Sequence, residues 1–186
     1  MGRIPRRSFW SILLALALLT GTSPVLQAQS QGVETAGDVL QILIPACGFA
    51  ATYVKGDPEG RSQFLKSFLL NFGTTVALKR IVGRERPDGS DHRSFPSGHA
   101  SAAFQGASFL HLRYGWVYGI AGYGGATVVA FSRVHAERHH VGDVLVGAGV
   151  GFFSSLLFTE RFDGLQANAS YEDGRLGLRA RLMVGR

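Results

Sequence analysis

Cysteine and charge are both scarce in this sequence. Its 186 residues include one cysteine, Cys47, which excludes an intrachain disulfide, and the apolar residues around Cys47 predict that it lies in the core. Charged residues make up 17% of the chain and apolar residues 46%, which is little charge for a soluble protein. The mean hydropathy of +0.12 is nevertheless low for a protein embedded entirely in lipid. Composition alone therefore leaves a membrane protein and a soluble protein both open.

The start of the chain also lacks acidic residues and has the features of an export signal. Three arginines precede the apolar stretch "FWSILLALALL", and Ala28 is a small residue suited to a cleavage site. We predict that residues 1–28 are a signal peptide or, if retained, a first membrane helix. In both cases the arginines keep the N-terminus in the cytoplasm, so residue 30 emerges on the outer face. The net charge of +6 says little about partners, and no nucleic-acid partner is expected.

Five apolar segments after the leader predict helices, because their apolar or small residues recur at helical spacing. The segments are "AGDVLQILIPACGFAATYV", residues 62–81, residues 99–114, "WVYGIAGYGGATVVAFSRV" and a segment from His139 or His140 to Phe158. They predict an all-α domain over residues 36–160, a bundle of about five core helices. From residue 164 to 186 the pattern alternates around Asp173-Gly174, which predicts a short C-terminal β-hairpin.

Three polar clusters interrupt the apolar segments, and each falls at a predicted helix end. They are residues 79–87, 96–99 and 132–143. Antiparallel helices would bring all three clusters to one end of the bundle. We therefore expect one site that combines cations, histidines and a carboxylate.

The cations of these clusters suit a phosphate monoester, whose oxygens must be neutralised during phosphoryl transfer. Arg86 and Arg133 can each present a forked pair of donors, and Lys79 adds a point charge. Ser97 is the expected N-cap of a helix, so the amides of Ser97 and Gly98 add donors. Other arginines near the clusters are expected to be solvated loop charges: Arg80, Arg84 and Arg93.

Two histidines supply the remaining chemistry. His139 can attack phosphorus through Nε2 if its proton is on Nδ1, and Asp143, four residues later, is expected to hold that tautomer. His99 is expected to be the general acid that protonates the leaving oxygen.

The motifs K79-x6-R86-P87, P96-S97-G98-H99 and S132-R133-x5-H139-x3-D143 together resemble the complete signature of the type 2 phosphatidic acid phosphatase (PAP2) superfamily. The resemblance covers about residues 36–160. It implies a helical bundle, a site without metal or cofactor, and a phosphohistidine intermediate. It also implies that His139 is the nucleophile, Asp143 its partner and His99 the acid. The phosphate-binding residues it implies are Lys79, Arg86, Ser97, Gly98 and Arg133.

Rival interpretations remain open beside a lipid phosphatase. The same signature occurs in soluble acid phosphatases of broad specificity and in vanadium haloperoxidases, and a non-catalytic binder of anionic headgroups would need only the cations. A zinc site on His135 and His139 is disfavoured, because Arg133 and Arg138 would repel a cation.

The motifs do not name the substrate, but low charge and long apolar segments favour a phosphorylated lipid. The candidates are undecaprenyl pyrophosphate, phosphatidate, phosphatidylglycerol phosphate and lipid A. Counting crossings from an outer residue 30 places all three motifs on the exported side. We therefore expect a cell-envelope protein, either in the inner membrane with a site facing the periplasm or soluble in the periplasm.

Overall fold

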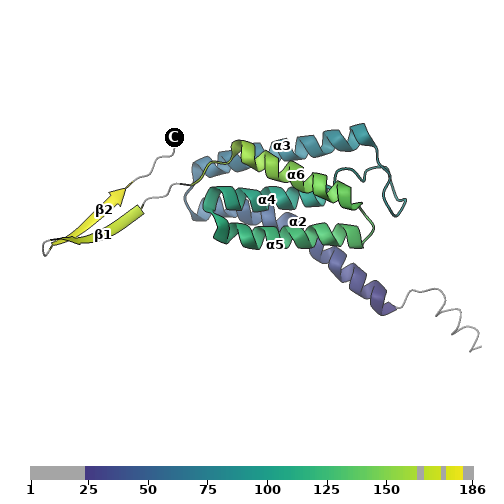
Figure 1. Cartoon of the computed structure of the whole chain (residues 1–186), viewed down its shortest axis with the longest axis horizontal. Helices are drawn as coiled ribbons and strands as arrows, with labels where there is room; N and C mark the ends of the chain where they lie inside the picture. The colour runs from purple at the N-terminus through teal and green to yellow at the C-terminus, as the bar shows by residue number, and fades with distance from the viewer. Residues whose placement is uncertain (1–23, 163–165, 173–174, 182–186) are drawn as a thin grey trace, which may run out of the picture.

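The computed structural model describes residues 24–162, 166–172 and 175–181, so most of the predicted leader lies outside the described residues. The described part contains five helices and a two-stranded sheet, which agrees with the predicted all-α domain and hairpin (Figure 1). The elements are α2 (Pro24–Val54), α3 (Pro58–Val82), α4 (Gly98–Tyr114), α5 (Trp116–His135), α6 (Val141–Phe158), β1 (Gln166–Glu172) and β2 (Arg175–Arg181).

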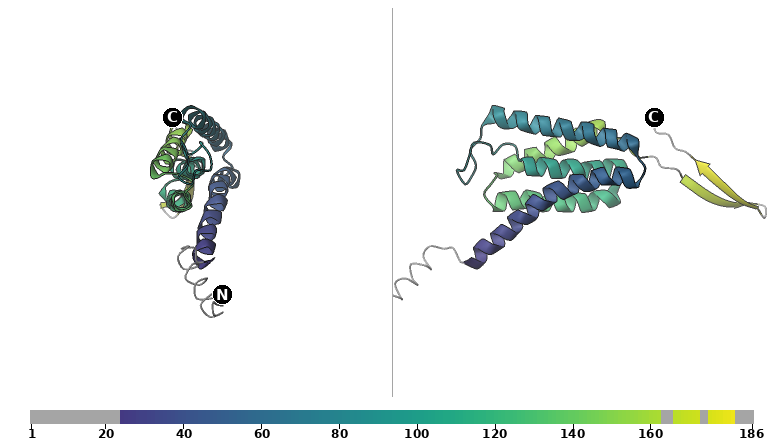
Figure 2. Two further views of the ribbon diagram at one scale, coloured as in Figure 1. Left: turned by 90° about the vertical axis from the view of Figure 1, so that its right-hand side faces the viewer. Right: turned by 180° about the vertical axis from the view of Figure 1, so that it is seen from behind.

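Helix α2 begins 12 residues earlier than its apolar segment predicts. Its first half projects beyond the other helices (Figures 1 and 2). Between Pro24 and Pro45 the segment holds no proline and two glycines, Gly32 and Gly37, so the helix continues through its polar part. Ala28 lies inside α2, and cleavage there stays a prediction.

Local capping explains where the helices that carry the motifs begin and end. Helix α3 starts after Asp57, whose carboxylate accepts from the Gly60 amide at 2.8 Å, and ends at Gly83 with a left-handed φ of 55°. Helix α4 starts after Ser97, whose hydroxyl accepts from the Ala100 amide, as predicted.

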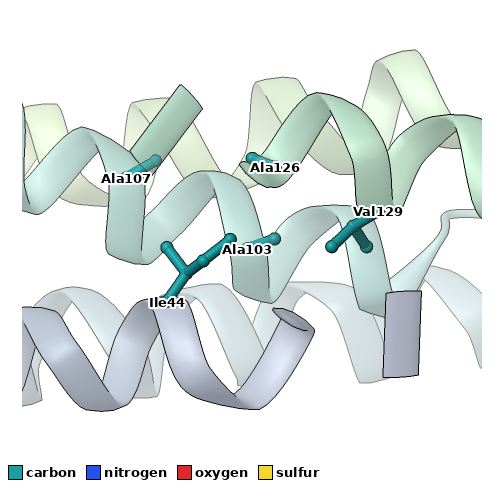
Figure 3. Close-up of a cluster of buried hydrophobic side chains, with 5 residues drawn as sticks. All are labelled: Ile44, Ala103, Ala107, Ala126 and Val129. Atoms are coloured by element: carbon teal, nitrogen blue, oxygen red, sulfur yellow. The ribbon is translucent and has the colours of Figure 1, made fainter. Parts of the chain in front are cut away.

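Helix α4 is central and contacts the four other helices. Small residues allow this close packing: an ideal Cβ on Gly106 of α4 would lie 2.6 Å from the backbone of Pro45 in α2. One apolar cluster at these helix contacts consists largely of alanine (Figure 3). It contains Ile44, Ala103, Ala107, Ala126 and Val129, from α2, α4 and α5.

Polar side chains are also found between the helices. The hydroxyls of Thr75 and Ser101 lie 2.9 Å apart, and Gln105 donates to the Ser67 hydroxyl at 2.9 Å. Ser155 donates to the main-chain carbonyl of Gln105 at 2.8 Å. These hydrogen bonds link α3, α4 and α6 across their interfaces. Hydrogen bonds of this kind between helices are typical of membrane-embedded helix bundles.

Large apolar side chains, in contrast, lie on the outside of every helix except α4. Ile42, Leu69, Ile120 and Leu157 are each at least 66% exposed. Among the described residues, two helical stretches are long and apolar enough to cross a membrane, Gln31–Val54 and Val141–Phe158. Cys47 is also exposed, so the prediction that it lies in the core is wrong: the apolar run around it covers the outer face of α2 as well as the inner one.

A buried ion pair lies at the end of the bundle where α3 begins and α4 and α6 end. Arg113, at the end of α4, donates to both carboxylate oxygens of Asp57 at 2.6 and 2.7 Å, and both side chains are under 5% exposed. The Tyr114 hydroxyl also donates to Asp57, and Arg113 reaches the Glu160 carbonyl at 2.8 Å. This cluster ties the start of α3 to the ends of α4 and α6.

The C-terminal strands form the predicted hairpin. β1 and β2 pair antiparallel with Glu172 opposite Arg175, and the predicted turn at Asp173-Gly174 lies outside the described residues.

Candidate active site

The three polar clusters meet at one end of the bundle, where α3 and α5 end and α4 and α6 begin (Figure 1). Main-chain hydrogen bonds join them: the Ser97 amide donates to the Asp143 carbonyl at 2.9 Å, and the Asp88 amide donates to the Glu137 carbonyl at 3.2 Å. Arg86 adds a side-chain bond to the Arg138 carbonyl at 3.3 Å. The loops between the helices are thus held against each other, which assembles the residues predicted to form a site.

His139 lies in the short connection between α5 and α6 and is 3% exposed. Its Nδ1 is 2.7 Å from the main-chain carbonyl of Ser94. Because a carbonyl oxygen only accepts, Nδ1 carries the hydrogen, and the neutral ring keeps a lone pair on Nε2. Burial, followed by the positive charge of Lys79, lowers the pKa of His139 to about 4. His139 is therefore a neutral imidazole at physiological pH.

The predicted contact between Asp143 and the ring of His139 is wrong. The Asp143 carboxylate instead accepts from the hydroxyl of Ser94, from the His140 amide at 3.0 Å and from Arg84 at 2.9 Å. The i to i+4 argument fails because α6 begins at Val141, so His139 is outside the helix and does not share its spacing. The hydrogen bonds that link Asp143 to His139 pass through Ser94, whose hydroxyl donates to the carboxylate and whose carbonyl accepts from Nδ1 of the ring.

Arg84 and Ser94 are thus parts of the site that sequence reasoning missed. Arg84 was expected to be a solvated loop charge, yet it forms an ion pair with Asp143, whose side chain is fully buried. Ser94 is also fully buried. Neither residue stands at a spacing that indicates a partner, because both contacts depend on how the loop between α3 and α4 folds back.

The predicted phosphate-binding cations gather at this end, and each already has protein partners. Lys79 donates to the carbonyls of Arg93 and Pro96 at 2.8 and 2.7 Å. Arg86 donates through Nε to Asp91 at 2.7 Å. The Ser97 amide, expected to be free for phosphate, is bonded to the Asp143 carbonyl, so that prediction is wrong. Lys79 and Arg86 keep further N–H groups for a ligand.

Helix α2 contributes a carboxylate, Asp38, that was not among the predicted site residues. Asp38 Oδ1 accepts from Arg133 at 2.8 Å and lies 3.0 Å from His99 Nε2. Arg133, which is 3% exposed, also donates to the Glu34 carbonyl at 2.7 Å. Asp38 therefore orients two predicted site residues. The available signal was that Asp38 is the single acid of the apolar segment "AGDVLQILIPACGFAATYV".

His99 experiences opposing effects. Burial, and then the charge of Arg133, lower its pKa, while the nearby Asp38 carboxylate raises it, with a net lowering. A bound phosphate would add negative charge and favour the protonated ring. Within the described ranges, no group of three or more His, Cys, Asp or Glu side chains is arranged to hold a metal ion.

Known proteins resemble this chain in sequence. Residues 62–165 match the family profile of the PAP2 superfamily. The chain is 46% identical over 105 residues to the lipid A 1-phosphatase of Porphyromonas gingivalis, an alignment that covers 50% of this chain and 23% of that protein. It is 30% identical over 141 residues to the lipid A 4'-phosphatase of Helicobacter pylori, covering 70% of this chain and 71% of that protein.

A solved structure resembles it in fold. The crystal structure of Aquifex aeolicus LpxE has a TM-score of 0.58 and 21% sequence identity, and covers 74% of this chain and 87% of that chain. This likeness confirms the predicted helical fold, and the family match confirms the predicted superfamily. The names of the two relatives agree with the predicted class of enzyme, a phosphatase.

Proposed function

Because the chain belongs to the PAP2 superfamily, we propose that it is a phosphatase that removes phosphate from a membrane lipid through a phosphohistidine at His139. The observation that carries the proposal is the hydrogen bond from His139 Nδ1 to the Ser94 carbonyl, at 2.7 Å. It presents an unprotonated Nε2 beside a set of cations, which is the state that a nitrogen nucleophile requires.

The reaction has two steps. His139 Nε2 attacks phosphorus, so that an N–P bond forms while the P–O bond to the lipid breaks, and His99 gives its proton to the leaving oxygen. Water then attacks the phosphohistidine, gives a proton to His99 and breaks the N–P bond, which releases inorganic phosphate. Both imidazoles return to their starting states. Asp38 supports His99 in this cycle, because its carboxylate stabilises the protonated ring.

The cations supply the charge that phosphoryl transfer needs. Lys79, Arg86 and Arg133 neutralise the phosphate oxygens as negative charge shifts in the transition state. The Gly98 amide, in the first turn of α4, is a further donor. We propose that this arrangement acts without a metal ion, because Lys79, Arg86 and Arg133 would supply the positive charge that a metal ion otherwise provides.

Among the four candidate lipids, lipid A has the best support. The two relatives described above are named as phosphatases of lipid A, at two different positions. The exposed apolar surfaces of four helices favour a membrane protein over a soluble acid phosphatase. We also propose that the site opens on the exported side, where the helix ends that form it would lie.

Phosphate release from lipid A by purified protein tests the proposal. We expect turnover in excess chelator, inhibition by vanadate, and a covalent phosphate that can be trapped on the protein. His139→Ala should abolish both turnover and trapping. His135→Ala is a matched control, because His135 is exposed and stacks on Phe131 outside the site. Activity that disappears in chelator and returns with zinc or magnesium would refute metal independence.

A further inference from the structure

A second cationic cavity lies beside the candidate active site. It has a volume of about 420 Å³ and is formed by the last turns of α3 and the loop that leads to α4. On the helix, its lining residues follow one stripe at helical spacing, and the loop closes the other side. The lining residues are Val76, Lys79, Arg80, Gly83, His92 and Arg93.

The charged residues that line this cavity are all positive. Lys79, Arg80 and Arg93 are cationic, and none of the lining residues is acidic. In the part of the chain that the structure describes, the guanidinium groups of Arg80 and Arg93 take part in no ion pair. Asp91, an acid in the same loop, is paired with Arg86 at 2.7 Å. Three like charges around a small cavity repel each other, and a bound anion would relieve that repulsion.

Within the residues that the structure describes, Arg93 is hydrogen-bonded to the site through its main chain only. Its amide donates to Asp91 at 2.8 Å, and its carbonyl accepts from Lys79 at 2.8 Å. The backbone position is thereby fixed while the side chain is exposed and available to a ligand. Arg80 is likewise exposed, one residue after Lys79 on α3. Two guanidinium groups can bind phosphate oxygens through paired N–H donors.

Lys79 connects this cavity to the reacting phosphate. Its ammonium group donates at 2.7 Å to the carbonyl of Pro96, the first residue of the turn that carries His99. The same side chain lines the second cavity. One ligand molecule can therefore occupy both places, with Lys79 between them.

We propose that this cavity, the Arg80–Arg93 pocket, binds a second phosphate group of the same lipid molecule whose first phosphate reacts at His139. The inference rests on the proposed function and deepens it, because it predicts a preference for lipids that carry two phosphates over lipids that carry one. The reacting phosphate would be selected by its distance from the second one.

Binding to an inactive protein tests the pocket separately from catalysis. The protein is full-length His139→Ala in detergent micelles, and the ligands are bisphosphoryl lipid A and its two monophosphoryl forms. We expect bisphosphoryl lipid A to bind about tenfold or more tightly than either monophosphoryl form, the effect of one added set of charge-assisted hydrogen bonds. Adding Arg80→Gln and Arg93→Gln should reduce this preference to about twofold or less and leave monophosphoryl binding unchanged.

Arg161→Gln is the matched control, because Arg161 is an exposed arginine at the other end of the bundle, just after α6. Its preference for bisphosphoryl lipid A should equal that of the parent. The pocket is refuted if the parent shows no preference, or if the double variant keeps it. If inorganic phosphate strengthens monophosphoryl binding, the pocket takes a free phosphate, and the proposal that the second phosphate belongs to the same lipid molecule is refuted. Turnover by the wild-type protein is measured separately: hydrolysis without a binding preference refutes the pocket alone, and a preference without hydrolysis refutes the proposed function alone.

Discussion

Replacing Ser94 with alanine interrupts the chain of hydrogen bonds that runs from Asp143 through Ser94 to His139. The substitution removes the hydroxyl that Asp143 accepts but keeps the main-chain carbonyl to which His139 Nδ1 donates. Asp143 retains its bonds to Arg84 and to the His140 amide, so the carboxylate stays in place. What the variant loses is the anchor that holds the Ser94 carbonyl, and with it the ring, in position.

The expected loss of activity follows from the burial of the hydrogen bond between Ser94 and Asp143. A hydrogen bond to a charged group contributes about 1.5–3 kcal/mol, and Ser94 and Asp143 are both fully buried, so water does not replace the lost partner. If that free energy acts on the orientation of His139, kcat falls by about 10- to 150-fold. KM should change little, because the cations that would bind phosphate are untouched.

The assay is steady-state phosphate release together with single-turnover trapping of the phosphoenzyme. Ser94→Ala should slow formation of the trapped species, whereas Ser90→Ala, at an exposed serine of the same loop, should not. A thermal unfolding midpoint for each variant separates loss of orientation from loss of fold. If Asp143 acted on His139 directly, Ser94→Ala would leave kcat within about twofold of wild type, since a direct carboxylate–imidazole pair does not depend on the serine. That result would refute the hydrogen-bond chain.

Three other predictions concern pH, stability and topology. Burial lowers the pKa of His139 to about 4, and the proposed mechanism requires its neutral ring as the nucleophile. We therefore expect kcat/KM to be insensitive to this group near neutrality and to fall as the pH drops through about 4, measured as a pH–rate profile. Asp57→Ala should destabilise the bundle by about 3–5 kcal/mol, measured by denaturant unfolding, because it leaves the Arg113 guanidinium buried without its carboxylate; a loss below about 1 kcal/mol would contradict this. Ser90→Cys should react with an impermeant thiol reagent in intact spheroplasts. The variant also carries Cys47→Ser, because Cys47 is itself exposed and could react. Labelling that occurs only after the membrane is broken would refute an exported site.

The assembly of the site at one end of the bundle could be predicted from the sequence. Each polar cluster interrupts an apolar segment, so each must lie at a helix end, and alternating helix directions bring those ends together. Ser97 as the N-cap of α4 followed from the same local reasoning, because a cap depends on residues three positions apart. The hairpin followed from alternation around Asp173-Gly174, which is equally local.

Only the tertiary structure decided which groups contact each other within the site. Spacing suggested Asp143 as the partner of His139 Nδ1, but the structure places the Ser94 carbonyl there, because a main-chain carbonyl has no sequence signature and its direction depends on the fold of the loop. Asp38 lies 61 residues from His99 along the chain, and only the packing of α2 against α4 brings the two together. The exposure of Cys47 was likewise decided in three dimensions. An apolar segment is compatible with a core or with lipid, and the side of α2 that faces outward depends on its neighbours.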